Sequence, residues 1–249
     1  QLNVELSPSV TLEQVEIKAK RSKRIEEQSQ LSVVEVPIQQ IKKIPALLGE
    51  TDVLKALQLL PGVQSGGEGQ NGLYVRGGSP DQNLILLDGV PLYNVSHLFG
   101  FFSVFNADAI KNVTLMKGGF PARYGGRLAS VIDISMKEGN MKSYHGAASI
   151  GIISSRLMFE GPIIKDKSSF IVSGRRTYID FLARPFIENA FNSVEGQSGS
   201  VGYFFYDLNA KINIRLNRNN RLFLTAYSGN DDFSRFTTSS VHTFGIQWK

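Results

Sequence analysis

Apolar and polar residues alternate most regularly in the C-terminal half of the chain. From Tyr206 to Leu216 every second residue is apolar, and the residues between them are Asp, Asn, Lys or Arg. A period of two over about eleven residues predicts a β-strand with one apolar face, of the length that crosses a membrane. Residues 156–163 and 242–248 alternate in the same way. The pattern predicts about six such strands, over residues 144–152, 155–163, 169–181, 204–216, 221–230 and 241–249.

The connections between these strands help to decide which kind of sheet they form, since a water-facing sheet of a soluble sandwich would alternate too. Residues 164–167 and 217–220 are short turns, whereas residues 183–203 form a long polar connection. Short turns at one end of the strands and long loops at the other are typical of membrane barrels. An arc of about six strands cannot close and would leave unpaired edges in lipid. The sequence therefore predicts part of a larger barrel.

The region before these strands has shorter apolar runs, separated by turns that contain glycine. Three such runs, Leu73–Val75, Leu84–Leu87 and Val113–Met116, predict a small sheet with tight connections. A helix is predicted to begin after a cap at Thr51, because apolar residues recur at helical spacing until the Pro-Gly pair at 61–62.

Composition and motifs limit the chemistry. The chain has no cysteine, and its net charge of +5 is dispersed, which argues against disulfides, thiolate metal sites and nucleic acid binding. The glycine-rich residues 64–72 lack the Gly-Lys-Ser/Thr ending of a phosphate loop. Asp88 precedes Gly89, so a tight turn explains it better than catalysis. Without a nucleophile–base pair or a metal-ligand cluster, we predict no enzyme, no catalytic residue, no metal and no cofactor.

Five short motifs follow one another within residues 60–127. They are Leu60-Pro61-Gly62-Val63, Val75-Arg76-Gly77-Gly78, Leu87-Asp88-Gly89-Val90-Pro91, Lys117-Gly118-Gly119-Phe120-Pro121 and Tyr124-Gly125-Gly126-Arg127. Their order and spacing resemble the plug domain of TonB-dependent outer-membrane receptors and transporters, in particular Bacteroidota-type members. The resemblance implies an α+β plug domain, a small mixed sheet with short helices, followed by the first antiparallel strands of a transmembrane β-barrel of about 22 strands.

The resemblance also implies a domain organisation. Residues 1–10 are expected to end an upstream domain, and residues 11–30 to form a TonB-box segment with a linker. Residues 31–138 are then the plug domain, and residues 139–249 the first strands of the barrel. This arrangement implies that the chain is the first part of a longer protein.

Energy coupling is assigned by the resemblance to a segment near the N-terminus, Leu12, Glu13, Gln14, Val15, Glu16 and Ile17. It is similar to a TonB box of the form Leu-x-Glu-Val-x-Val, with the acidic residue displaced by one position. An exposed extended segment can add as a strand to the sheet edge of another protein. By its pattern alone, the segment is better explained as an edge strand of an upstream domain. Its position directly before the charged linker favours the coupling role.

Two plug loops are expected to face the ligand. They supply Glu68, Gln70 and Asn71 from the first loop, and Tyr93, Asn94, Ser96 and His97 from the second. A lone histidine is more often structural than a ligand contact. For His97, a structural role and contact with the ligand therefore both stay open. Three arginines, Arg76, Arg123 and Arg127, are expected to form ionic contacts between plug and barrel, because a buried arginine needs an acidic partner.

The function implied by the resemblance is TonB-dependent active transport across the outer membrane of a Gram-negative bacterium. The partners would be TonB, outer-membrane lipid and a small ligand, for which metal chelates, vitamins, peptides and glycans all stay open. Residues 128–131 differ from the sequence usual in the glycan-importing branch, which argues against a surface lipoprotein as a further partner. The alternative is a non-transporting barrel that serves secretion or surface assembly.

Overall fold

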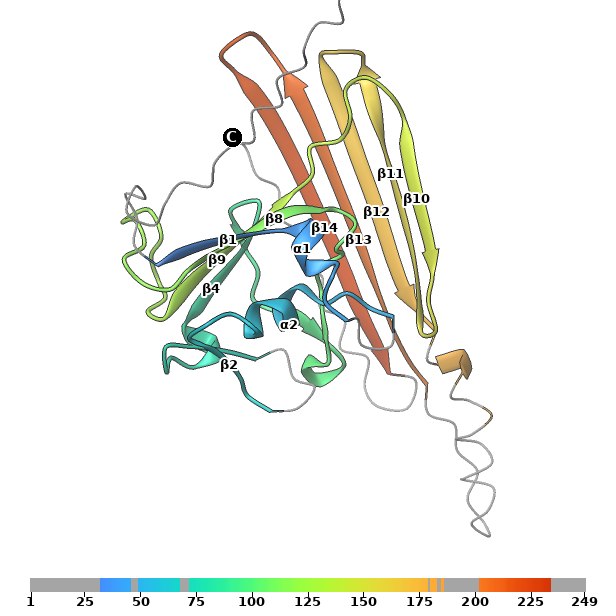
Figure 1. Ribbon diagram of the computed structural model, residues 1–249. Coiled ribbons are helices and arrows are strands. Elements are labelled where there is room, and N and C mark those ends of the chain that lie inside the picture. Colours follow the sequence, from blue (N-terminus) through green and yellow to red (C-terminus); the bar gives the residue numbers. More distant parts are fainter. Residues whose placement is uncertain are drawn as a thin grey trace, which may run out of the picture. The chain divides into compact units, whose positions relative to one another are not determined.

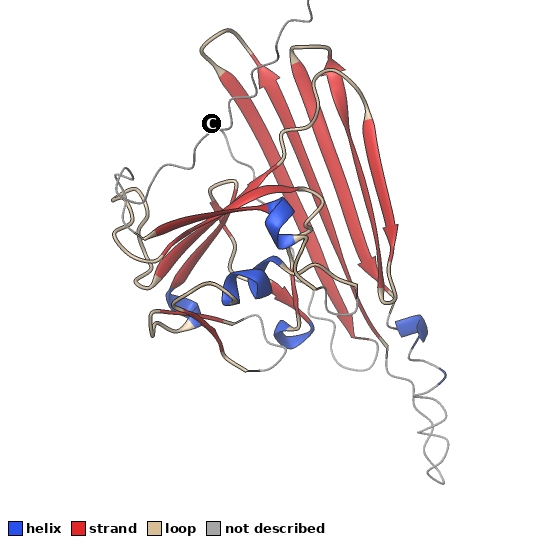
Figure 2. Cartoon of the chain, viewed as in Figure 1, coloured by secondary structure: helices blue, strands red, loops and turns tan. Residues whose placement is uncertain are grey.

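The computed structural model describes residues 32–45, 49–67, 72–178, 180–182, 185 and 202–233 of the 249-residue chain. These residues belong to one unit that begins at Ser32. Strands dominate this unit, and its helices are short (Figure 2). None of the helices in the described part is long and apolar enough to cross a membrane.

The first half of the described chain builds a five-stranded mixed sheet, in the order β1-β8-β9-β4-β5 (Figure 1). Its strands are β1 (Val33–Pro37), β4 (Asn83–Leu87), β5 (Val90–Pro91), β8 (Ile110–Met116) and β9 (Ser130–Met136). Strand β4 runs parallel to β9, and the other neighbours are antiparallel. The predicted small mixed sheet is therefore confirmed.

Short elements surround this sheet. They are the helices α1 (Ile38–Ile41) and α2 (Val53–Gln58), the 3-10 helices η2 (Pro80–Gln82) and η3 (Leu98–Gly100), and two small hairpins formed by β2 (Val63–Ser65) with β3 (Leu73–Val75) and β6 (Ser96–His97) with β7 (Phe102–Ser103). The core between α2 and the sheet is apolar, with Leu54, Leu57, Leu115, Ile132 and Ile134 fully buried. Burial of these side chains holds helix and sheet together.

Two turn and cap predictions can be compared with this structure. The cap of α2 is Asp52, because its carboxylate accepts hydrogen bonds from the backbone N–H groups of Leu54 (2.9 Å) and Lys55 (3.1 Å). The predicted cap at Thr51 is therefore wrong by one residue. The turn between β4 and β5 is confirmed, since Asp88 and Gly89 have φ angles of 51° and 83°, as in the two-residue turns of hairpins.

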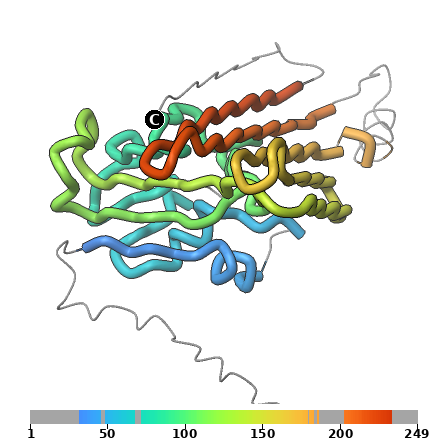
Figure 3. The backbone as a smooth tube through the Cα atoms, turned by 90° about the horizontal axis from the view of Figure 1, so that it is seen from above, coloured from blue at the N-terminus to red at the C-terminus, as the bar shows by residue number. Residues whose placement is uncertain are grey.

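The second half of the described chain forms an antiparallel sheet in which each strand pairs with the next along the chain (Figures 1 and 3). Its strands are β10 (His145–Ile150), β11 (Ser154–Ile164), β12 (Ser168–Thr177), β13 (Tyr203–Arg215) and β14 (Arg221–Phe233). They correspond to five of the predicted long strands, and the sixth, residues 241–249, lies outside the described residues. We call the end at residues 165–167 and 216–220 the turn end, and the end at residues 178 and 202 the loop end.

The two faces of this long sheet reverse the arrangement usual in water-soluble proteins. Along β13 the polar residues Asp207, Asn209, Lys211 and Asn213 are buried, whereas Leu208 is 51% exposed. The outward residues of the neighbouring strands are also apolar and exposed, among them Leu157, Phe159, Ile163 and Val172. A sheet with a polar inner face and an apolar outer face suits a wall between an aqueous or protein-filled interior and lipid.

Candidate functional site

The predicted coupling segment and the first predicted ligand loop cannot be placed. Leu12, Glu13, Gln14, Val15, Glu16 and Ile17 lie outside the described residues, and so do Glu68, Gln70 and Asn71. Their assigned roles stay predictions.

The second predicted ligand loop is described, and its residues have different surroundings. Tyr93 is 82% exposed, Asn94 is exposed, and Ser96 is half-buried in β6. These three remain open to contact with a ligand. His97 is only 3% exposed, so ligand contact at its ring has no support in this structure.

The ring of His97 lies between two carboxylates of the long sheet. Its Nε2 is 2.8 Å from Oδ1 of Asp207 on β13, and its Nδ1 is 3.0 Å from Oδ2 of Asp231 on β14. The ring also stacks on Phe205, with centroids 4.1 Å apart and planes 8° apart. Histidine 97 therefore joins the β6–β7 hairpin directly to β13 and β14.

A second cation, Arg175 on β12, shares Asp207 with this histidine. Its guanidinium donates to the Asp207 carboxylate through both Nε (2.9 Å) and Nη2, and Nη2 also donates to the Ser103 carbonyl (2.6 Å). Its Nη1 lies 3.4 Å from the Glu50 carboxylate. Arginine suits such a site, because its planar group can bond several acceptors at once.

These contacts extend to the N-terminal end of helix α2. The Ser103 N–H donates to the carboxylate of Asp52 (2.7 Å), which also caps α2. Glu50, two residues before Asp52, accepts a hydrogen bond from the Ser154 hydroxyl on β11. We call Glu50, His97, Arg175, Asp207 and Asp231 the loop-end cluster, since it lies near the loop end of the long strands.

Tyr203 and Tyr227 complete this cluster from the long sheet. The Tyr203 hydroxyl donates to Asp231, and the Tyr227 hydroxyl donates to Oδ1 of Asp207 (2.8 Å). A Cβ on Gly229 would lie 2.3 Å from the Tyr227 hydroxyl, so any larger residue there would displace this hydroxyl. A cavity of only about 10 Å³ adjoins His97 here, which leaves room for about one water molecule and not for a ligand.

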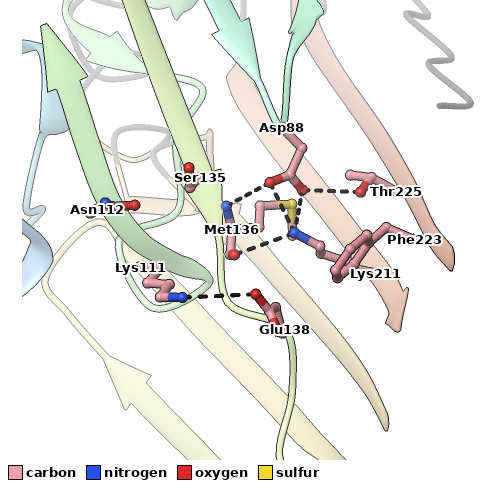
Figure 4. Close-up of a pocket in the computed structure, with 9 residues that line it drawn as sticks. All are labelled: Asp88, Lys111, Asn112, Ser135, Met136, Glu138, Lys211, Phe223 and Thr225. Carbon is pink, nitrogen blue, oxygen red and sulfur yellow. Dashed lines mark hydrogen bonds and ion pairs between the residues drawn. The ribbon is translucent and has the colours of Figure 1, made fainter. Parts of the chain in front are cut away.

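A second polar cluster joins the two sheets near the turn end (Figure 4). The Lys211 ammonium donates to the Asp88 carboxylate (2.9 Å), and Asp88 also accepts from the Thr225 hydroxyl (3.0 Å) and the Met136 N–H (3.0 Å). Glu138 accepts from Arg221 (3.5 Å) and lies 3.8 Å from Lys111. We call Asp88, Glu138, Lys211, Arg221 and Thr225 the turn-end cluster.

A cavity of about 310 Å³ opens beside the turn-end cluster. The residues that line it come from both sheets: Asp88, Lys111, Asn112, Ser135, Met136, Glu138, Lys211, Phe223 and Thr225 (Figure 4). A space of this size and polarity admits water. The Glu138–Arg221 pair is open to solvent, whereas Lys211 and Asp88 are only 7% and 11% exposed and reach water through this cavity.

The pKa shifts reflect these surroundings. Burial alone would lower the pKa of His97, but the charges and hydrogen bonds of Asp207 and Asp231 outweigh it and raise the pKa. Burial raises the pKa of Asp108, yet the hydrogen bond from Lys42 and the charge of Arg156 outweigh this effect and lower the pKa. Arg156 lies on β11, 3.7 Å from the Asp108 carboxylate, so this pair is a third ionic contact between the sheets.

The three arginines predicted to contact the barrel have other neighbours. Arg76 donates to the hydroxyl of Ser32 (2.7 Å), Arg123 stacks on the ring of Tyr124, and Arg127 donates to the carbonyl of Gly126. Their predicted role has no support among the described residues. The inter-sheet ionic contacts are instead made by the members of the two clusters and by the pair Asp108–Arg156.

Sequence reasoning missed the partners of these contacts. The signal was present in the alternating strands, because Asp207 and Lys211 occupy the polar positions of β13 and must point inward if the apolar face meets lipid. Their partners His97 and Asp88 lie on short elements and turns, where no periodic pattern marks them. The same holds for Glu50, the partner of Arg175.

Comparison with known proteins identifies the first half of the structure. Residues 26–131 match the family model described as the TonB-dependent receptor plug domain. The chain contains a TonB-dependent receptor plug domain. From here we call the mixed sheet with its helices the plug, and strands β10–β14 the wall strands.

Solved structures of similar fold include both parts. The siderophore receptor PirA from Acinetobacter baumannii is 21% identical with a TM-score of 0.57, over 82% of this chain and 32% of that one. A variant of the ferric enterobactin receptor PfeA from Pseudomonas aeruginosa is 22% identical (TM-score 0.56, 84% and 34%). The outer-membrane transporter YddB from Escherichia coli is 15% identical (0.56, 84% and 34%).

The match in fold extends from the plug into the wall strands, which confirms the predicted plug followed by barrel strands. The chain spans about a third of the length of these structures. No curated protein matches the chain by sequence. The predicted boundaries at residues 10, 30 and 138 stay predictions.

Proposed function

We propose that the protein containing this chain is a TonB-dependent transporter in the outer membrane of a Gram-negative bacterium. The observation that carries the proposal is the reversed polarity of the wall strands beside a plug domain. Their apolar residues are exposed, and their polar residues face the plug in two ionic clusters. A plug held by polar contacts can exchange them for contacts with water, which an apolar interface could not do at similar cost.

In this proposal the loop end faces outward and receives the ligand. Tyr93, Asn94 and Ser96 would contact it, together with Glu68, Gln70 and Asn71. TonB would then pair with residues 12–17 on the periplasmic side and draw on the inner-membrane proton gradient. Part of the plug would rearrange, and the ligand would pass between the plug and the wall.

The ligand belongs to the proposal too. Two of the similar structures are receptors for siderophores or ferric enterobactin, so metal chelates are the first class to test. Vitamins, peptides and glycans stay as further classes. A surface lipoprotein partner is not favoured, because residues 128–131 differ from the sequence usual in the glycan-importing branch.

Deletion of residues 12–17 tests this division of labour. We expect uptake to be lost and ligand binding at the cell surface to be retained, because the proposal assigns binding to other loops of the chain. The control is a protein in which residues 21–26, in the adjacent linker, are scrambled at constant length. Loss of surface binding on deletion of residues 12–17 would contradict the proposal.

The alternative function is a non-transporting barrel that uses its plug for docking in secretion or surface assembly. Cells in which this protein is the sole receptor for a ligand decide between the two. Ligand accumulation inside such cells supports transport, whereas binding without accumulation under all conditions supports docking.

A further inference from the structure

The two hydrogen bonds of His97 require a doubly protonated ring. A neutral imidazole has one N–H donor and one acceptor nitrogen, so it can donate to one carboxylate only. Here both nitrogens face carboxylate oxygens, at 2.8 Å and 3.0 Å. The imidazolium is the form that bonds Asp207 and Asp231 together.

The charges around His97 favour the same form. The groups that face it or its partners are Arg175 on β12, Tyr203 and Asp207 on β13, Tyr227 and Asp231 on β14, and Glu50 before α2. Both tyrosines donate to the aspartates, as ionised carboxylates require. The cluster holds the three carboxylates Glu50, Asp207 and Asp231 and one guanidinium, so a second cation reduces its excess of negative charge.

The polar side-chain contact of the β6–β7 hairpin with the wall depends on this ring. His97 on β6 makes that contact, and the carbonyl of Ser103 on β7 accepts from Arg175. Phe102 on β7 adds an apolar contact with Phe205, with ring centroids 5.8 Å apart. Both polar contacts meet at Asp207, which the two cations share. If the ring of His97 lost a proton, one nitrogen would turn a lone pair toward a carboxylate, and a favourable contact would become repulsive.

We propose that His97 is a positioning residue, whose imidazolium holds the β6–β7 hairpin on wall strands β13 and β14 and whose deprotonation releases this hairpin. The hairpin directly follows the exposed residues Tyr93 and Asn94. Protonation of one buried side chain therefore sets the position of the loop that the proposed function assigns to the ligand. The role of this loop in ligand binding rests on the proposed function, whereas the contacts of His97 with Asp207 and Asp231 do not.

The direction of the pH effect follows from the raised pKa of His97. Its contribution to seating of the hairpin is complete below the ordinary histidine pKa of about 6.5. It is lost as the pH rises through the raised value. Between these two values the equilibrium constant for opening should rise about tenfold per pH unit, because opening then releases one proton.

A single cysteine can report this opening. The chain has no cysteine of its own, and Ser103 is fully buried with no hydrogen-bond partner for its hydroxyl among the described residues. Ser103→Cys is nearly isosteric, so its thiol should react with a maleimide only when the hairpin opens. The rate at each pH is divided by that of the exposed Ser143→Cys variant, which removes the pH dependence of the thiol itself.

The experiment uses the full-length protein in outer-membrane vesicles, titrated from about pH 5 to pH 10. We expect a normalised rate that is low in acid and rises with pH to a plateau above the raised pKa of His97. His97→Gln should give a high rate that is flat with pH, because glutamine cannot gain the charge. His145→Gln, the same change at an exposed histidine, should leave the profile unchanged.

Two further outcomes keep the proposal testable if His97→Gln does not assemble. Asp231→Asn should move the midpoint of the rise to lower pH, because it removes one of the two carboxylates that favour the cation. The proposal would be overturned if the labelling rate of Ser103→Cys did not change with pH while His97 is present. It would also be overturned if the rise with pH persisted in His97→Gln. Neither readout requires uptake, so failure of the proposed transport is detected separately.

Discussion

The loop-end and turn-end clusters join the same plug to the same wall strands, yet they differ in their access to water. At the loop end, Asp207 is fully buried and Glu50, His97 and Arg175 are 2–3% exposed. At the turn end, Glu138 and Arg221 are 35% and 45% exposed, and a cavity of about 310 Å³ lies beside them. Asp88 and Lys211 of the turn end are only 11% and 7% exposed, but they line this cavity, so access to water is what distinguishes the two clusters.

This difference decides how strongly each cluster holds the plug. Removal of one partner from a buried ion pair costs about 3–5 kcal/mol, because the other charge is left without solvent. Exposed pairs contribute about 0–1 kcal/mol, because water replaces the partner. We therefore expect the loop end to hold the plug firmly and the turn end to separate from the wall first.

The largest effect is expected from Asp207→Asn. This change leaves the buried cations of Arg175 and His97 without their shared carboxylate, at a cost of about 3–5 kcal/mol. The normalised labelling rate of Ser103→Cys should rise by more than about 100-fold, since each 1.4 kcal/mol is about a factor of ten.

A matched control for this change is Asp166→Asn, at an exposed turn residue of the same sheet. Asparagine tolerates the positive φ of 59° at this position. Labelling should not change in this variant. A rise in Asp207→Asn no larger than in the control would show that the loop-end cluster does not hold the hairpin.

An intermediate effect is expected from Lys211→Met at the turn end. Asp88 keeps its hydrogen bonds from Thr225 and Met136 and borders the cavity, so the loss should be about 1–3 kcal/mol. Lys211→Met should raise the labelling rate of a cysteine at Ser135, which also lines the cavity, by a larger factor than that of a cysteine at Ser103. Equal changes at both positions would contradict the separation of the two clusters.

Much of the fold could be predicted from the sequence, because its signals are local and periodic. The alternation of β13 predicted a strand with two different faces, and the Asp88-Gly89 pair predicted a hairpin turn. The cap of α2 was missed by one residue, since Thr51 and Asp52 are both good caps and the choice depends on contact with Ser103. Such tertiary contacts leave no trace in a single sequence.

The inter-sheet clusters were less predictable, because they too consist of tertiary contacts. Partners such as Glu50 and Arg175 are more than a hundred residues apart in the sequence. Arg76, Arg123 and Arg127 were predicted to contact the barrel because a buried arginine needs an acidic partner. They donate instead to Ser32, Tyr124 and Gly126 within the plug. Burial, which selects the relevant charges, becomes known only when the two sheets are placed together.

A smaller effect, visible at acid pH, is expected at the contact between Asp108 and Arg156. The lowered pKa of Asp108 means that its contribution is present above the ordinary aspartate pKa of about 3.9, and is lost as the pH falls through the lowered value. Plug seating should thus weaken at acid pH through Asp108 and at alkaline pH through His97. Thermal unfolding of the plug measured against pH should lose its acid limb in Asp108→Asn and keep its alkaline limb.

The smallest effect is expected from Glu138→Gln. Glu138 contacts Arg221 at 3.5 Å and Lys111 at 3.8 Å, but all three side chains are substantially exposed. Water and salt therefore replace the lost charge, and the plug should be destabilised by no more than about 1 kcal/mol. The loss of stability in Glu138→Gln should disappear in about 1 M salt, where the Debye length falls to about 3 Å. The effect of Asp207→Asn should persist, because salt does not reach that site. Similar salt dependence in the two variants would mean that burial does not separate the clusters.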